Sequence, residues 1–421
     1  QGTLTVDVTY YEFNNSEIYM GPGAEIYVEQ RMKISESSVE GCDEMWRGIR
    51  LKPDVNATLI FENSTIRDAQ YAISASKNTL VNAIGNNFEN NYVGIYAPEG
   101  VETFTSTITQ NTFQGTDDLL PAYSGQNPAP ASLPYAGIEL HNIIGIDIGV
   151  QGQSTASNSF KSLCNGIVTE GTDIAVFTPE FIGIQGTGEY SLTGHGIHAK
   201  GAGQTLIVEG MNENASGPFS FESCPIGIWA QNMHVDIRNN SMTDMRTGVH
   251  VELGKNRNIL VEDNYVSCSS FGIDLFHNDP ALEMKVHSNT VKVLYTSPFQ
   301  KGNAIQVYEG GLAHTDAAIT NNEVRIYATV NGISLNTVQN MRLAGNAVYL
   351  QNANKNYSGI ALRKTLGITL AVNEVQGVST GGINNRAYNI SSSERAYLDC
   401  NTAYKTRTGF RFDDSCADTD F

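Results

Sequence analysis

The middle of the sequence carries side chains that suit the recognition of sugars. His198, Trp229 and His250 follow one another at steps of 229 − 198 = 31 and 250 − 229 = 21 residues, although the chain has only eight histidines and two tryptophans. Acidic, amide, basic and aromatic residues accompany them, namely Tyr96, Glu139, His141, Glu170, Lys200, Gln231, Glu252, Asp274, Phe276 and Tyr308. Ring faces pack on the apolar side of a pyranose, and carboxylates and amides bind its hydroxyls. These thirteen residues are therefore candidate glycan-binding residues.

A short repeat explains the spacing of these residues. A small residue followed by Ile, Val or Phe recurs at steps such as 72 − 48 = 24 and 94 − 72 = 22. Its small residues are Gly48, Ala72, Gly94, Gly137, Gly166, Gly196, Gly227, Gly248, Gly272, Ala304, Gly332, Gly359, Gly382 and Gly409. An Asn with an apolar residue two positions later precedes many of them, as in Asn86/Phe88, Asn264/Val266 and Asn346/Val348. Each repeat has room for three short strands and no helix.

The period, the Asn and the inward Ile, Val and Phe together resemble the right-handed parallel β-helix of the pectate-lyase-like superfamily. The resemblance implies an all-β fold, a single β-solenoid of about fourteen coils with three strands per coil and an Asn corner. We expect one domain over residues 1–421, with an irregular first coil or N-terminal cap over 1–44 and an acidic C-terminal end over 413–421. Asn tolerates the left-handed backbone of a sharp corner. A β-sandwich is the alternative, but it needs no Asn at one fixed corner.

A second resemblance is local. The segment from Cys42 to Ile49 resembles the opening coil of secreted bacterial β-helix repeat proteins exported by the type IX route. This likeness implies a secreted protein, extracellular or on the outer cell surface, and a processed or partial chain. Charged residues make up 17% of the chain, and no stretch has the ~18 apolar residues of a membrane span. Cys400 and Cys416 flank the last expected strand and could pair.

In the resembled family the strand that starts at Gly-Ile is the first strand, and its outer face carries substrate sites. Residues two positions after each small residue then form one outward column: Arg50, Ser74, Tyr96, Glu139, Val168, His198, Trp229, His250, Asp274, Gln306 and Ser334. Residues four positions after it form a second column: Lys52, Ser76, Pro98, His141, Glu170, Lys200, Gln231, Glu252, Phe276, Tyr308 and Asn336. We expect Trp229 to be exposed between His198 and His250, and insertions such as 114–134 to frame this face.

Catalysis has candidates on the same face. Glu252 and Asp274 lie diagonally on neighbouring coils, about 8 Å apart between Cα atoms, which approaches the carboxylate separation of inverting glycosidases. His250 and Lys200 are the further catalytic candidates, but Lys200 is expected to pair with Glu170. The sequence has no metal-ligand spacing, so we expect no cofactor. Asp117 and Asp118 are the candidates should Ca²⁺ bind.

The net charge of 26 − 44 = −18 argues against binding nucleic acid or anionic lipid. The expected partner is a polysaccharide or cell-surface glycan, and the favoured function is glycan binding or adhesion without turnover. A polysaccharide hydrolase or lyase is one alternative. A structural subunit of an extracellular fibre or large adhesin is another, because the open ends of a solenoid favour end-to-end stacking with another domain or subunit.

Overall fold

The computed structural model describes residues 2–101, 104–127, 132–186, 193–211, 220–254, 256–278, 283–294, 302–310, 317–327, 331–351, 357–378, 385–413 and 416. The chain consists of two compact units, and each is described by itself. Unit 1 comprises Gln1–Met211 and Ser220–Pro225, and unit 2 comprises Asn212–Phe219 and Ile226–Phe421. A single domain over 1–421 stays a prediction. Gly382 and most of 413–421 lie outside the described residues, as do parts of the insertion over 114–134.

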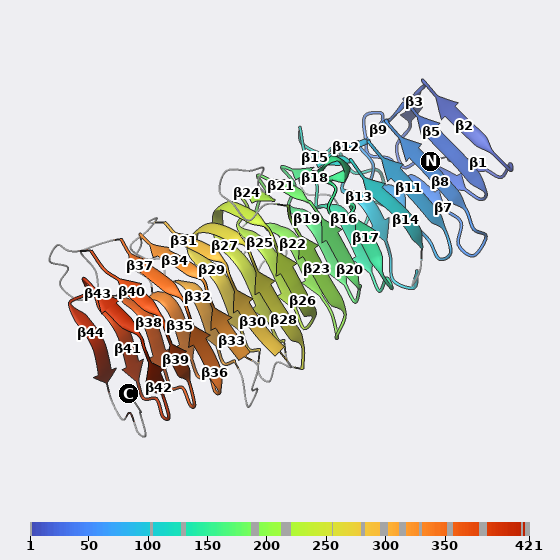
Figure 1. Cartoon of the computed structure of the whole chain (residues 1–421). Coiled ribbons are helices and arrows are strands. Elements are labelled where there is room, and N and C mark those ends of the chain that lie inside the picture. Colours follow the sequence, from blue (N-terminus) through green and yellow to red (C-terminus); the bar gives the residue numbers. More distant parts are fainter. Residues whose placement is uncertain are drawn as a thin grey trace. The chain divides into compact units, whose positions relative to one another are not determined.

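Unit 1 is built from three ladders of parallel strands, which the chain visits in turn (Figure 1). The first-strand ladder holds β1 (Thr3–Val6), β4 (Glu25–Val28), β7 (Gly48–Leu51), β10 (Tyr71–Ser74), β13 (Val93–Ala97), β16 (Ala136–His141), β19 (Asn165–Glu170) and β22 (His195–Lys200). The second is interrupted: β2 (Tyr11–Asn14), β5 (Arg31–Ser35), β8 (Thr58–Glu62), β11 (Leu80–Ile84) and β14 (Thr105–Thr109) form one ladder, and β17 (Ile146–Ile148), β20 (Ile174–Phe177) and β23 (Thr205–Glu209) belong to another. The third holds β3 (Glu17–Met20), β6 (Ser38–Gly41), β9 (Thr65–Arg67), β12 (Asn87–Glu89), β15 (Thr112–Gln114), β18 (Ser159–Lys161), β21 (Glu180–Ile182) and β24 (Phe221–Glu222).

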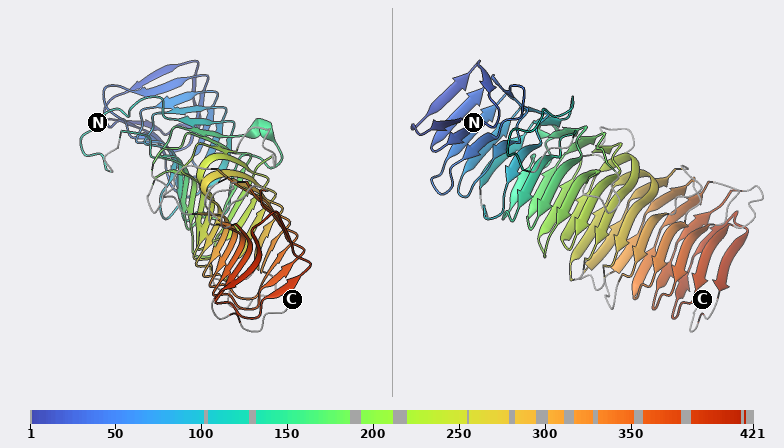
Figure 2. Two further views of the ribbon diagram at one scale, coloured as in Figure 1. Left: turned by 90° about the vertical axis from the view of Figure 1, so that its left-hand side faces the viewer. Right: turned by 180° about the vertical axis from the view of Figure 1, so that it is seen from behind.

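Unit 2 repeats this arrangement, and Figure 2 shows its strands from two further sides. Its first strands are β25 (Ile226–Gln231), β32 (Asn303–Tyr308), β35 (Asn331–Asn336), β38 (Ser358–Arg363), β41 (Arg386–Ser391) and β44 (Thr408–Asp413). Its second strands are β26 (His234–Arg238), β28 (Asn258–Glu262), β30 (Glu283–His287), β33 (Ala317–Thr320), β36 (Met341–Ala344), β39 (Thr369–Ala371) and β42 (Tyr397–Asp399). Its third strands are β31 (Thr290–Val293), β34 (Glu323–Ile326), β37 (Ala347–Leu350), β40 (Glu374–Gln376) and β43 (Thr402–Tyr404). β27 (Ser241–Glu252) and β29 (Tyr265–Phe276) each serve as third and then first strand.

The fold class predicted from the sequence is confirmed: the chain is an all-β, right-handed parallel β-helix of about fourteen coils. The one described helix is the 3-10 turn Ser154–Ala156. Residues 1–44 contain β1 to β6, and β1 and β4 form regular parallel pairs ahead of Gly48.

Packing inside the coils explains why each repeat needs a small residue. In unit 1 the rings of Phe88, Phe113, Phe160, Phe181 and Phe221 stack along the core at 4.5–5.0 Å between centroids. A Cβ added to Gly137 would lie 2.5 Å from the ring of Phe160. In unit 2 a Cβ on Gly248 would lie 2.4 Å from Val266. The apolar residue of the Asn motif therefore occupies the space that the small residue leaves.

The Asn motif forms a buried ladder in each unit. The side-chain amide of Asn264 donates to Oδ1 of Asn289 at 3.0 Å, and that of Asn240 donates to Oδ1 of Asn264 at 3.1 Å. The expectation that this Asn itself adopts the left-handed backbone is wrong. Positive φ falls on the preceding residue, such as Asp263 at 52° and Ser288 at 51°. The ladder Asn contributes its amide to neighbouring coils, while its predecessor makes the turn.

Candidate functional site

The two outward columns predicted from the sequence exist within each unit. In unit 1, Tyr96 pairs in register with Glu139, and Glu170 lies between His141 and Lys200. In unit 2, two rows follow the first strands. They are Trp229–His250–Asp274–Gln306–Ser334 and Gln231–Glu252–Phe276–Tyr308–Asn336. We call the outer side of these strands the first-strand face.

The first-strand face of unit 2 is largely buried at its centre. Trp229 is only 7% exposed, so the expectation of an exposed tryptophan is wrong. His250 and Asp274 are 9% and 6% exposed. Their side chains form a polar network: Nδ1 of His250 lies 2.9 Å from Oδ2 of Asp274, and its Nε2 lies 3.3 Å from Oε2 of Glu252. In this unit, side chains that point outward from a first strand are therefore not necessarily exposed to solvent.

Further amides complete this network. Gln231 donates to Oε1 of Glu252, and Gln306 donates to Oδ1 of Asp274 at 3.1 Å. One imidazole thus joins two carboxylates, and each carboxylate also accepts a hydrogen bond from a glutamine. This pairing is how a protein stabilises charges that it withholds from water.

The network sets the protonation of its members. Burial acts to lower the pKa of His250, but the hydrogen bonds and charges of Asp274 and Glu252 outweigh it and raise the pKa to about 9. Burial acts to raise the pKa of Glu252, but the hydrogen bonds from His250 and Gln231 lower it overall. At neutral pH the imidazole is therefore a cation, and Glu252 is an anion.

Aromatic side chains flank the network. The rings of Phe276 and Tyr308 stack at 5.0 Å with an interplanar angle of 12°, and both side chains are half-buried. Trp229 meets the ring of His250 edge-on at 6.0 Å. His277, beside the ring of Phe276, pairs with Glu309 at 2.5 Å. Much of the aromatic surface of unit 2 is therefore in contact with other side chains.

The first-strand face of unit 1 is more open. Nε2 of His141 lies 3.0 Å from Oε1 of Glu139, and both side chains retain partial exposure. Glu170 and Lys200 are exposed and form an ion pair at 3.0 Å, as the sequence predicts. The hydrogen bond to Glu139 raises the pKa of His141, and the hydrogen bond from Lys200 lowers that of Glu170. His198, half-buried, packs its ring 4.9 Å from that of His195.

Three tyrosines beside this face were not among the sequence candidates. Tyr71 stacks on Tyr96 with centroids 4.2 Å apart, and Tyr92 stacks on Tyr135 at 5.6 Å. Tyr71, Tyr92 and Tyr135 lie one or two positions before a small residue, outside both outward columns. A column read two positions before the small residue would have found Tyr92 and Tyr135, and a column read one position before it would have found Tyr71.

The insertion over 114–134 lies at the corner that leads into the first strands of unit 1. The carbonyl of Pro121 accepts the N–H of Met45 at 2.9 Å, and the carbonyl of Asn127 accepts the side-chain amide of Gln70 at 2.9 Å. Tyr123 is 7% exposed and hydrogen-bonds Gln70. The described part of the insertion is therefore packed against the residues just before β7 and β10.

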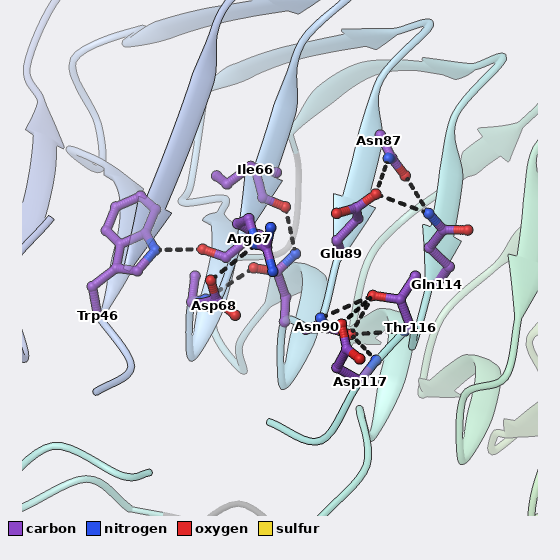
Figure 3. A network of polar contacts seen from close by, with 12 residues as sticks. Trp46, Ile66, Arg67, Asp68, Asn87, Glu89, Asn90, Gln114, Thr116 and Asp117 are labelled. Atoms are coloured by element: carbon purple, nitrogen blue, oxygen red, sulfur yellow. Dashed lines mark hydrogen bonds and ion pairs between the residues drawn. The ribbon is translucent and has the colours of Figure 1, made fainter. Parts of the chain in front are cut away.

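A polar network on the third strands of unit 1 lies near the start of this insertion (Figure 3). The backbone N–H groups of Thr116 and Asp117 donate to Oδ1 of Asn90 at 2.8 and 3.2 Å. The indole of Trp46 donates to the carbonyl of Arg67 at 2.8 Å. Burial raises the pKa of Asp68 to about 6, against the opposing effect of Arg67. Asp117 is thus tied to a turn, and Asp118 beside it is exposed.

Two shallow hollows of about 340 and 480 Å³ adjoin each other in unit 1 and share Asn56 and Thr58 in their walls. None of the predicted site residues lines either one, apart from the column residue Lys52 at the edge of the larger hollow.

Over the described residues, no group of three or more His, Cys, Asp or Glu side chains could hold a metal ion. Cys400 and Cys416 are free thiols, so the possible disulfide does not form in this structure. Within the same described part, no helix is long and apolar enough to cross a membrane.

Comparisons with known proteins bear on the fold. A family model for a right handed beta helix region matches residues 2–117, and a search of curated proteins finds no match. Among solved structures, the A-module of mannuronan C-5 epimerase AlgE4 from Azotobacter vinelandii is 8% identical, with 93% of this chain and 89% of that chain covered and a TM-score of 0.28. DFA-IIIase from Arthrobacter chlorophenolicus A6 is 12% identical, with 91% of this chain and 83% of that chain covered and a TM-score of 0.30. Tailspike protein 3 of bacteriophage CBA120 is 11% identical, with 98% of this chain and 55% of that chain covered and a TM-score of 0.23. At these values the likenesses carry no argument about activity.

Proposed function

We propose that the chain binds a polysaccharide or cell-surface glycan, without turnover, through the first-strand face of unit 1. The observation that carries this proposal is the partly exposed row in which Tyr96 adjoins the Glu139–His141 pair. The ring offers apolar contact to a pyranose, and the carboxylate and imidazole offer hydrogen bonds to its hydroxyls. The setting that we propose is extracellular, as a secreted or outer-surface adhesin.

Binding without turnover is supported by the charge states of the candidate acids. Hydrolysis between two carboxylates needs one of them protonated near neutral pH. The pKa of Glu252 is lowered, whereas that of His250 is raised to about 9. A cationic His250 is no general base at neutral pH. Hydrolase or lyase activity on this face is the alternative, and the experiment must distinguish it from binding without turnover.

The experiment is calorimetric titration of the full chain against a panel of soluble glycans, followed by the same titration of Tyr96→Ala. The loss of one ring contact should weaken binding by about 1–2 kcal/mol, roughly five- to thirty-fold. Tyr349→Ala is the matched control, because Tyr349 is also half-buried but lies on the third strand β37 of unit 2. Its affinity should equal that of the parent.

The outcomes separate the three functions. Equal glycan affinity of Tyr96→Ala and the parent, with both folded, would remove this face from the proposal. Release of reducing sugar, or new absorbance from unsaturated uronate, would establish the enzymatic alternative. Filaments, or a size that grows with concentration in sedimentation, together with no glycan binding, would favour the fibre subunit.

A further inference from the structure

Four tyrosines and one carboxylate lie on or beside the first-strand face of unit 1. They are Tyr71, Tyr92, Tyr96 and Tyr135, and the carboxylate is that of Glu139. We propose that this group, which we call the tyrosine cage, binds a positively charged amino group of the ligand. The glycan recognised is then an amino-sugar polymer whose amines are not acetylated. The inference rests on the proposed glycan-binding function and specifies its ligand class.

The cage is held in place by packing and by backbone contacts. Its rings form two stacked pairs, Tyr71 on Tyr96 with an interplanar angle of 15° and Tyr92 on Tyr135 with an angle of 20°. The backbone N–H of Tyr135 donates to the carbonyl of Tyr92 at 2.8 Å. The residue before Tyr71 is Gln70, which the insertion over 114–134 holds through two side-chain contacts. All four rings are half-buried, so they are fixed and still reachable from solvent.

Glu139 places a negative charge among these rings. Tyr96 and Glu139 are register partners on β13 and β16. Burial is the main cause of the raised pKa of each of the four phenols, and the charge of Glu139 adds to it in every case. By register the carboxylate adjoins the stacked pair of Tyr71 and Tyr96, and its charge also acts on Tyr92 and Tyr135.

One side of Glu139 remains available to a ligand. Its Oε1 contacts His141, whereas its Oε2 has no hydrogen-bond partner among the residues that the structure describes. Within the same set, no Lys or Arg lies over any of the four rings. The cation–π contacts of unit 1 use other tyrosines, as with Arg47 over Tyr123 at 5.7 Å. The cage thus holds a carboxylate oxygen and aromatic surface, and the basic group at its edge is His141, which pairs with Oε1 of Glu139 and meets the ring of Tyr96 edge-on at 6.1 Å.

An ammonium group satisfies both features at once. Aromatic rings attract cations through their quadrupole, and a carboxylate attracts a positive charge directly. An anionic glycan would instead bring a second negative charge beside Glu139. The net charge of −18 also favours the approach of a polycation over that of a polyanion.

The test is a titration of the full chain with three oligosaccharides of equal length: glucosamine oligomers carrying permanent trimethylammonium groups, their N-acetylated counterparts, and neutral glucose oligomers. Work at pH 8 reduces the charge on the competing His141. The trimethylammonium oligomer should bind about tenfold or more tighter than the acetylated one. Glu139→Gln should lower the affinity for the trimethylammonium oligomer more than the affinity for the acetylated one, and should thereby remove most of this preference.

Two further variants test the role of the aromatic rings and control for the change in net charge. Tyr71→Leu keeps apolar volume but removes one aromatic ring, and it should also reduce the preference for the cationic oligomer. Glu323→Gln, on the third strand β34 of unit 2, makes the same change in net charge and should leave the preference intact. Circular dichroism establishes that each variant is folded.

The outcomes distinguish this inference from the proposed function. Equal binding of cationic, acetylated and neutral oligomers, unaffected by Glu139→Gln, would overturn the tyrosine cage while glycan binding stands. If Glu323→Gln also lost the preference for the cationic oligomer, the preference would follow from the net charge of the protein alone. That result would likewise overturn the tyrosine cage. Binding of none of the three oligomers, together with no binding of any glycan in the wider panel, would overturn both.

Discussion

The buried Asn ladder of unit 2 allows a quantitative test of how the repeat stabilises the coils. Asn264 is 1% exposed. Its side-chain nitrogen donates to the carbonyl of Ile237 at 3.0 Å and to Oδ1 of Asn289 at 3.0 Å. Its Oδ1 accepts the backbone N–H of Asn240 at 3.0 Å. One side chain therefore connects its own coil with the coils on both sides.

Replacing Asn264 by Leu keeps the volume but removes these bonds. The N–H of Asn240 loses this acceptor and the carbonyl of Ile237 loses this donor, both inside the core. Each buried polar group left unsatisfied costs about 1–3 kcal/mol, so two groups set the loss at about 2–6 kcal/mol. For a unit of this size, 1 kcal/mol corresponds to about 2–4 °C, and we expect the melting temperature to fall by on the order of 10 °C.

Thermal unfolding followed by far-ultraviolet circular dichroism measures the change, and hydrogen exchange locates it in unit 2. Asn258→Leu is the matched control: Asn258 lies on the neighbouring strand β28, but its side chain is exposed. Such a surface change is expected to stay within about 0.5 kcal/mol. Equal melting temperatures for Asn264→Leu and Asn258→Leu would refute the reasoning, because the ladder would then contribute nothing beyond filling space.

Two further predictions concern the buried network of unit 2. Trp229→Ala should destabilise the unit by about 3–5 kcal/mol, as expected for removal of a buried indole. Phe276→Ala, the control, should destabilise it clearly less. Equal melting temperatures of the two variants would contradict this prediction. His250 has its pKa raised to about 9 from an unfolded value near 6.5, so its stabilisation is complete below about pH 6.5 and is lost as the pH rises through about 9. The stability of the parent relative to His250→Gln should therefore shrink between pH 6 and pH 10, and a constant difference in chemical denaturation would count against the network.

The fold and its register followed from the sequence because one steric relation recurs in many of the coils. The apolar residue of the Asn motif needs the space beside a residue without a large side chain, as Phe160 does at Gly137. That relation fixes which residues point inward, and the outward columns follow from the alternation of a strand. The prediction for the corner was partly wrong, because it placed the left-handed backbone at the ladder Asn. The preceding residue, such as Asp263, adopts that conformation instead.

Burial on the outer face could not be read in the same way. Direction along a strand is a local property, whereas exposure depends on everything that packs against that strand. Trp229 and Glu139 each lie two positions after the small residue of a repeat, yet Trp229 is buried and Glu139 is half-buried. The sequence offers equal reason to expect either of them on a binding surface. Neighbours that differ from coil to coil decide between them.

The same argument explains why the proposed binding face is confined to unit 1, although the thirteen candidate residues lie in both units. In unit 2 the polar residues of the column satisfy one another, since His250 joins Asp274 and Glu252 and two glutamines complete the set. A network so completed has little capacity left for a ligand. In unit 1 Glu139 has one neighbour at hydrogen-bond distance and an oxygen to spare within the described residues. Recognition is expected where a polar group lies beside ordered aromatic surface and the protein has not already used all of its hydrogen-bonding capacity.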